Sequence, residues 1–148
     1  MIREPGTDVP VEGSPLHRRP RVLLADDHPL ILVGFHRLLK KSCAVIGTAS
    51  NGTRAIEATL RLRPDVLVVD LMFSDVNGLD VCRRVKQAAP ETDVVIVTAF
   101  DDMQIRQVAL QAGAAAFVVK HSAPGTLADI IRHIFTERQR ALLPVTGT

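Results

Sequence analysis

The stretch Asp65-Val-Leu-Val-Val-Asp70 decides the fold of this chain, because it joins a buried strand to an acid at the end of that strand. Four consecutive apolar residues between two aspartates are typical of a strand that is covered on both faces. Such strands belong to parallel sheets, whose ligands bind outside the carboxyl ends of the strands. Asp70 is therefore the first residue that we expect at a binding site.

Other apolar runs also end on a side chain that can bind a metal ion or a phosphoryl group. Besides Asp70, the side chains that close these runs are Asp26, Asp27, Thr98 and Lys120. The carboxyl ends of parallel strands meet at one edge of a sheet, so we expect these side chains to converge. Clustered carboxylates suit Mg²⁺, which takes oxygen ligands. A hydroxyl and an ammonium group suit the oxygens of a phosphoryl group.

Strand-like and helix-like segments alternate from residue 21 onward. The apolar pattern predicts strands at 21–25, 44–49, 66–69, 94–97 and 116–119, and helices at 28–41, 53–61, 101–112 and from Leu79 and Leu127 onward. Such strand–helix units imply a parallel sheet with helices on both faces. We therefore predict an α/β fold: a flavodoxin-like five-stranded parallel sheet in the order 2-1-3-4-5, with five helices on its two faces.

Helical spacing also predicts which residues of the last two helices face the core. These residues are Ile105, Val108 and Ala109 in the first of them and Leu127, Ile130, Ile131 and Ile134 in the second. Phe135 lies one position beyond the second stripe, and we expect it to be partly exposed. A weak homodimer through this last helix is a further hypothesis.

The composition indicates a single folded domain. The chain has 148 residues, 47% of them hydrophobic, and its net charge of +2 does not demand a nucleic-acid partner. We expect a flexible, proline-containing leader at 1–20, a domain at 21–138 and a tail or the start of a linker at 139–148. No apolar run approaches the roughly 18 residues that span a bilayer. We therefore expect a cytoplasmic protein, with Cys43 and Cys82 as buried thiols.

Two groups of polar residues have plainer interpretations. Arg18, Arg19 and Arg21 form the densest basic cluster, which we interpret as a solvated segment before the first strand. The histidines at positions 17, 28, 36 and 133 show no metal-ligand spacing, and we interpret them as structural or exposed.

Together, these features resemble a response-regulator receiver domain of two-component signalling, from about Arg21 to Glu137. The resemblance rests on Leu24-Ala-Asp-Asp-His-Pro, Val68-Val-Asp-Leu-Met, Asn77-Gly-Leu, Val97-Thr-Ala and Ala114-Ala-Ala-Phe-Val-Val-Lys, in this order. The opening motif is most similar to receivers of the subfamily that usually carries a helix-turn-helix output domain. The chain could be a single-domain receiver or the amino-terminal part of a DNA-binding regulator, and both interpretations stay open.

The resemblance implies a phosphoacceptor switch rather than an enzyme with a separate substrate. Asp70 would accept a phosphoryl group from a sensor histidine kinase or a phosphotransfer protein. Asp26, Asp27 and Asp70 would hold Mg²⁺ together with the backbone carbonyl of Met72.

Further residues complete the site that the resemblance implies. Thr98 would be the switch hydroxyl that bonds the phosphoryl oxygen, Lys120 would pair with the phosphoryl group, and Phe117 would be the switch aromatic residue. One position departs from the family pattern, because Ser74 stands where the family commonly has proline. Serine does not fix φ, so we expect a more mobile loop over 73–78.

Two other functions are compatible with part of this pattern. A phosphohydrolase of the haloacid-dehalogenase type also uses a strand-end aspartate, a hydroxyl, a lysine and Mg²⁺. It needs an acid two residues after the nucleophile, where this chain has Met72. A binding scaffold that never sees phosphate is supported only by Ser74.

Overall fold

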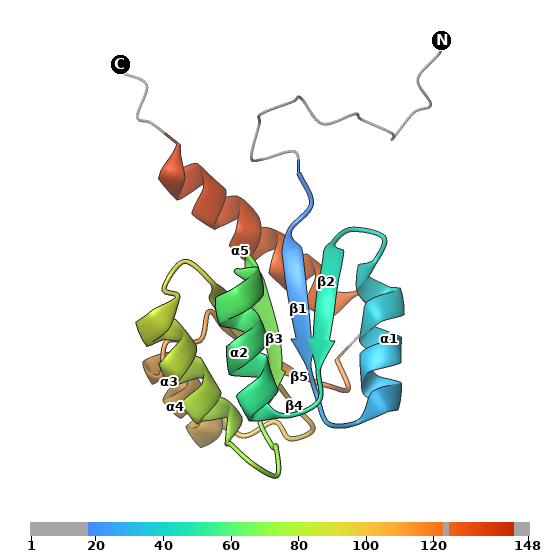
Figure 1. The fold of residues 1–148 in the computed structure, drawn as a ribbon, viewed down its shortest axis with the longest axis vertical. Helices are drawn as coiled ribbons and strands as arrows, with labels where there is room; N and C mark the ends of the chain where they lie inside the picture. Colours follow the sequence, from blue (N-terminus) through green and yellow to red (C-terminus); the bar gives the residue numbers. More distant parts are fainter. Residues whose placement is uncertain (1–17, 123–124, 144–148) are drawn as a thin grey trace.

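The structure is a computed structural model that describes residues 18–122 and 125–143. In this part of the chain, five strands alternate with five helices (Figure 1). The strands are β1 (Arg21–Ala25), β2 (Ala44–Ala49), β3 (Val66–Asp70), β4 (Asp93–Thr98) and β5 (Ala116–Val119). The helices are α1 (Pro29–Leu39), α2 (Gly52–Leu62), α3 (Gly78–Ala88), α4 (Met103–Gln111) and α5 (Thr126–Leu142). Most of the predicted leader and the end of the predicted tail lie outside the described residues.

The strands form one parallel sheet in the order β2-β1-β3-β4-β5, which confirms the predicted topology. Alternate residues of each strand enter two different cores. In β1, Leu23 and Ala25 pack under α2, α3 and α4, whereas Val22 and Leu24 pack under α1 and α5. All residues of β3 are buried, as expected for a strand covered on both faces. In Figure 1, α2 lies in front of the sheet and α5 crosses behind it.

Side chains and backbone geometry define several helix ends. The predicted helix at 28–41 begins at Pro29, because His28 is its extended N-cap residue, and it ends at Leu39. The predicted helix at 101–112 begins only at Met103, because the Asp102 carboxylate caps its first amides. Both predicted helices were therefore too long.

Two predictions about helix faces are wrong. In α4, Val108 is 38% exposed, because Ile105 and Ala109 define the buried stripe by their four-residue spacing and Val108 lies at its margin. In α5, Phe135 is only 4% exposed, because the buried stripe repeats every four residues from Leu127. The hydrophobic residue that suggested a dimer surface is thus part of the core. None of the helices in the described ranges is long and apolar enough to cross a bilayer.

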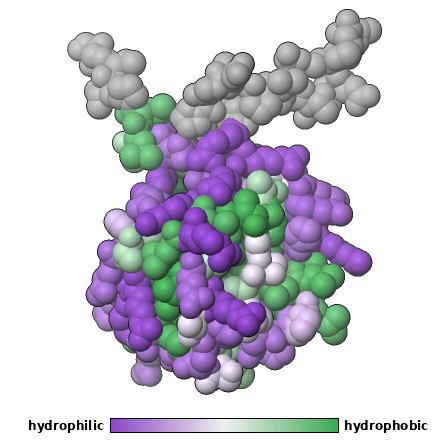
Figure 2. All heavy atoms as spheres, viewed as in Figure 1, coloured by the Kyte–Doolittle hydropathy of each residue, from purple (hydrophilic) through white to green (hydrophobic). Residues whose placement is uncertain are grey.

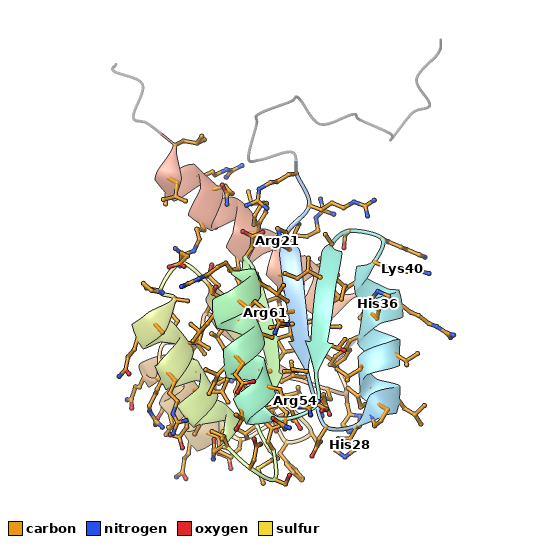
Figure 3. The ribbon with its side chains drawn as sticks, viewed as in Figure 1. Arg21, His28, His36, Lys40, Arg54 and Arg61 are labelled. Carbon is orange, nitrogen blue, oxygen red and sulfur yellow. The ribbon has the colours of Figure 1, made fainter. Side chains whose placement is uncertain are left out.

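The basic segment at the start of β1 connects the amino-terminal edge of the sheet to neighbouring elements. Arg18 makes two hydrogen bonds to Asp65, at 2.7 and 2.9 Å, and its guanidinium lies 4.8 Å from the centroid of the Phe135 ring. Arg19 and Arg21 donate to backbone carbonyls where α1 and α2 end. Arg18 and Arg19 are exposed, as we expected of a solvated segment, but residues 18 and 19 of the predicted leader also contact the domain. Figure 3 labels Arg21 at this edge, opposite His28.

The last turns of α5 are also fastened to the sheet. Arg138 donates two hydrogen bonds, at 2.7 and 2.8 Å, to the carboxylate of Asp93 at the start of β4. The helix continues to Leu142, and Gln139 is buried, so residues that we assigned to the tail belong to α5.

Replacement of Arg138 by alanine should lower the free energy of unfolding by about 1–2 kcal/mol, because the largely buried Asp93 loses its partner while solvent screens part of the loss. Arg140 is the matched control on the same helix, since its pair with Glu137 is 3.8 Å long and exposed. Arg140→Ala should change the free energy by less than about 0.5 kcal/mol. Urea denaturation of both variants measures the difference, and equal losses would contradict the role of the Asp93 contact.

Much of α1 is exposed to solvent. Leu39 is its only buried residue, and Leu30 and Val33 are 85% and 49% exposed. Figure 2 shows hydrophobic atoms at the surface on the right of the view, along α1 and next to β2. Since α1 begins just after β1, this apolar surface adjoins the edge of the sheet where the strands end.

Candidate functional site

The site lies at the carboxyl edge of the sheet, where four strands end at the same level. Asp70 is the last residue of β3 and lies opposite Val97, and Thr98 is the last residue of β4. Asp26 directly follows β1, and its amide donates to a carbonyl of β2. Lys120 directly follows β5, and its amide donates to the Thr98 carbonyl. The parallel register therefore brings strand-end residues together, as the sequence predicts.

A lysine and two carboxylates form the buried centre of the site. Lys120 Nζ lies 2.8 Å from Asp26 Oδ2 and 3.3 Å from Asp70 Oδ1. The side chains of the two aspartates are only 3% and 5% exposed. Burial alone would lower the pKa of Lys120, but its hydrogen bond to Asp26 and the charge of Asp70 raise it above its ordinary value. Lys120 therefore stays protonated and holds the acids together.

Asp70 is in an environment that disfavours its charge. Burial raises its pKa above the ordinary value, the charge of Asp26 raises it further, and Lys120 offsets part of both effects. A backbone hydrogen bond from Met72 also favours the ionised form. A cation bound beside Asp70 would relieve the remaining repulsion.

The carboxylates fit a hard divalent cation. Ligand atoms of Asp26, Asp27, His28 and Asp70 all lie within 4.8 Å of one another. Oxygen-rich sites with several negative charges are those that Mg²⁺ occupies in proteins. Asp27 is the most accessible of these acids, with 35% of its side chain exposed.

His28 was missed as a site residue by the sequence interpretation. Its Nδ1 lies 2.9 Å from Oδ1 of Asp26 and 2.9 Å from Oδ1 of Asp27. Asp26 Oδ1 also accepts a hydrogen bond from the His28 amide. The available signal was its position directly after the acid pair, just before a helix, where a side chain is turned back toward the strand end.

The two predicted switch residues lie on neighbouring strands and are both buried. Thr98 Oγ1 accepts a hydrogen bond of 3.2 Å from the Phe100 amide. The Phe117 ring is in the core, and the Arg106 guanidinium of α4 lies 5.0 Å from its centroid. The ring is therefore turned inward in this conformation, with a cation over its face.

The Asn77-Gly-Leu motif closes the loop that follows Asp70. Asn77 caps α3 by accepting a hydrogen bond from the Leu79 amide at 2.7 Å. A side chain at Gly78 would collide with the backbone of Asp70 and Leu71. Glycine is thus required for α3 to begin this close to the end of β3.

A family model built from known proteins matches most of this chain. The family model described as "Response regulator receiver domain" matches residues 22–132. The chain belongs to the response-regulator receiver family.

Curated relatives of this receiver domain are response regulators. Over 118 residues it is 32% identical to the oxygen regulatory protein NreC of Staphylococcus epidermidis, covering 78% of this chain and 54% of NreC. Over 126 residues it is 32% identical to the response regulator GacA of Pseudomonas viridiflava, covering 84% of this chain and 58% of GacA. The chain thus spans about half the length of the curated relatives it matches.

Solved structures agree with both the fold and the subfamily. A two-component response regulator of the LuxR family from Aurantimonas is similar with a TM-score of 0.78 and 28% identity, covering 81% of this chain and 87% of that chain. The receiver domain of NarL from Mycobacterium tuberculosis has a TM-score of 0.69 and 31% identity, covering 84% of this chain and 95% of that chain. The predicted flavodoxin-like receiver fold is confirmed.

Proposed function

We propose that this receiver domain is a phosphoacceptor switch in which Asp70 takes a phosphoryl group in a Mg²⁺-dependent reaction. One observation carries the proposal: Asp70, at the end of β3, is held beside Lys120 and within reach of the acidic cluster. The donor would be a sensor histidine kinase or a phosphotransfer protein, and the phosphorylated state would change partner binding. Such a switch operates in the cytoplasm, where these donors present their phosphoryl groups.

In the proposed reaction, an oxygen of Asp70 attacks phosphorus while the bond from phosphorus to the donor breaks. Asp26, Asp27 and Asp70 would hold Mg²⁺ with the Met72 carbonyl, and the cation would neutralise charge on the phosphoryl oxygens. Lys120 would turn from the carboxylates to the new phosphoryl group. Thr98 would exchange its hydrogen bond from the Phe100 amide for one to a phosphoryl oxygen, and Phe117 would adjust with it.

The alternatives account for less of the structure. A phosphohydrolase of the haloacid-dehalogenase type lacks its acid–base residue, because Met72 occupies that position and is 63% exposed. A scaffold that never sees phosphate leaves the buried contacts of Lys120 with Asp26 and Asp70 unexplained. We therefore propose only self-phosphorylation and self-dephosphorylation as chemistry.

Apolar side chains around the site fit a docking partner. Four apolar side chains that follow the carboxyl ends of strands are all more than half exposed: Leu30, Met72, Phe100 and Met103. Apolar surface around a charged centre is typical of interaction sites, and it supports a kinase or phosphotransfer protein as the partner.

Beryllofluoride, which mimics a phosphoryl group, tests the proposal. Heteronuclear NMR of the protein with Mg²⁺ and beryllofluoride should shift the amides of Thr98 and Phe117, and the same addition should leave Asp70→Asn unchanged. Identical spectra of the wild-type protein before and after the addition would reject the proposal.

The phosphorylated state should be long-lived because two apolar side chains flank the site. Met72 and Phe100 are exposed at the strand-end edge and cannot orient a water molecule for attack on phosphorus. Met72→Asn and Phe100→Glu should each hydrolyse roughly tenfold faster, which is less than the about 10²- to 10⁴-fold of a general acid or base, because the new side chain would only orient the water molecule.

Loss of phosphorylated protein after removal of the donor measures these rates. Leu110→Asn is the control, since it makes the same kind of change at the far end of α4, where Leu110 is 49% exposed. If neither Met72→Asn nor Phe100→Glu decays faster than the wild type and the control, the explanation by water exclusion fails.

A further inference from the structure

The loop between β3 and α3 is connected to the amino terminus of α2 by one carboxylate. Asp75 Oδ1 accepts a hydrogen bond from the Gly52 amide at 3.0 Å. Asp75 Oδ2 accepts from the Thr53 amide at 3.0 Å and from Thr53 Oγ1 at 2.8 Å. These contacts join segments that are more than 20 residues apart in the sequence.

The same loop contains the backbone that the proposed metal site needs. Its beginning is fixed by hydrogen bonds from Leu71 to Val97 and from Gly78 to Leu71. Met72 lies only two residues after Asp70, so the course of this loop sets where the Met72 backbone lies relative to the acid. Ser74 follows, where serine leaves φ unconstrained. Asp75 is the next residue, and its hydrogen bonds to Gly52 and Thr53 hold the loop in place after Ser74.

The contacts of Asp75 are more than an ordinary helix cap. α2 already has its own cap, because the Asn51 side chain accepts a hydrogen bond from the Arg54 amide at 2.8 Å. Asp75 also accepts hydrogen bonds from the two preceding amides, those of Gly52 and Thr53, which lie at the positive end of the helix dipole. The Thr53 amide is the main reason that the pKa of Asp75 is well below its ordinary value, so the carboxylate stays charged.

Packing supports the same connection. A side chain at Gly52 would come within 2.9 Å of the Val76 Cβ and 3.0 Å of the Val76 carbonyl. The loop and the first turn of α2 are thus in close contact at Val76 as well as at Asp75. The prediction of a more mobile loop considered only Ser74 and did not take into account the contacts of Asp75 and Val76 with α2.

We propose that Asp75 is a positioning residue for the metal site, because it holds the loop that carries Met72, whose backbone carbonyl the proposed site needs. The inference rests on the proposed function, since it names a residue that prepares the same site. Asp75 acts through Met72 and touches neither the cation nor the phosphoryl group.

Isothermal titration calorimetry with Mg²⁺ tests the inference in Asp75→Ala, Asp75→Asn and the wild-type protein. Calorimetry is suitable because the chain has no Trp or Tyr for fluorescence. Residues that orient metal ligands typically contribute about 10- to 100-fold to affinity, and we expect roughly tenfold weaker binding in Asp75→Ala. Asp75→Asn keeps one acceptor oxygen and should recover part of the loss. Glu57→Ala removes an exposed acid of α2 and should bind as the wild type does.

The outcomes separate positioning from mere stability and from failure of the proposed function. If Asp75→Ala lowers only the urea midpoint and the folded protein binds Mg²⁺ with unchanged affinity, Asp75 is a structural cap and the inference is overturned. Equal losses in Asp75→Ala and Glu57→Ala would also overturn it, because the effect would then be one of net charge. If the wild-type protein itself binds no Mg²⁺, the proposed function fails, and this inference fails with it.

Discussion

Replacement of Asp27 by alanine is expected to weaken Mg²⁺ binding by at least about 100-fold. Outer residues that only orient a ligand contribute about 10- to 100-fold, and a direct charged ligand should contribute no less. Asp27 is more informative to replace than Asp26, since its side chain is 35% exposed and its ion-pair partner in the described chain is His28. Asp26 also binds Lys120, so its loss would disturb the buried centre as well as the cation.

Calorimetric titration with Mg²⁺ measures this effect. Asp80→Ala is the matched control, because Asp80 is an exposed acid on α3 that forms an ion pair with the exposed Arg83, away from the acidic cluster. The control should bind Mg²⁺ with wild-type affinity. Wild-type affinity in Asp27→Ala would remove the acid pair from the metal site.

Replacement of Lys120 by methionine is expected to destabilise the metal-free protein by about 3 kcal/mol. The change leaves Asp26 and Asp70 buried without their shared cation, and removal of one partner of a buried pair costs about 3–5 kcal/mol. The lower value applies because Lys120 is 13% exposed. Mg²⁺ should restore much of the loss, since the cation binds the folded state and replaces the missing positive charge.

Urea denaturation of Lys120→Met, with and without Mg²⁺, measures both effects. Lys41→Met, at an exposed lysine that follows α1, is the control and should change the free energy of unfolding little. The pH dependence follows from Asp70. Because its pKa is raised in the folded state, the metal-free protein should gain stability as the pH falls through that pKa and Asp70 becomes neutral. Loss of Lys120 should strengthen this trend, because it removes the charge that favours ionised Asp70.

Much of the site could be predicted from the sequence because parallel strands end at one edge. Asp70 and Lys120 lie 50 residues apart in the sequence, yet the strand order alone brings the ends of their strands to one edge. The apolar runs identified the strand ends, and the side chain that follows each run could be named from the sequence. Buried strands therefore located the acids, the hydroxyl and the lysine.

The features that were missed depend on contacts between segments rather than on local pattern. Phe135 was expected to be partly exposed, but α5 is rotated so that it packs inward beneath Arg18. His28 lacked metal-ligand spacing, yet a turn brings it back onto the acid pair. Asp75 is an ordinary loop acid in the sequence, and its role appears only when the loop lies against α2. Helical periodicity does not fix the rotation of a helix, and sequence spacing does not show where a loop folds back.

The measurement that tests the central proposal most directly is the mass of the intact protein after incubation with acetyl phosphate. With Mg²⁺, the wild-type chain should gain one phosphoryl group, and fragmentation after borohydride reduction should locate the modification at Asp70. Without Mg²⁺, or in Asp70→Asn, no phosphoryl group should be gained. No modification of the wild type with Mg²⁺ present, or equal modification of Asp70→Asn, would contradict the assignment of Asp70 as the phosphoacceptor.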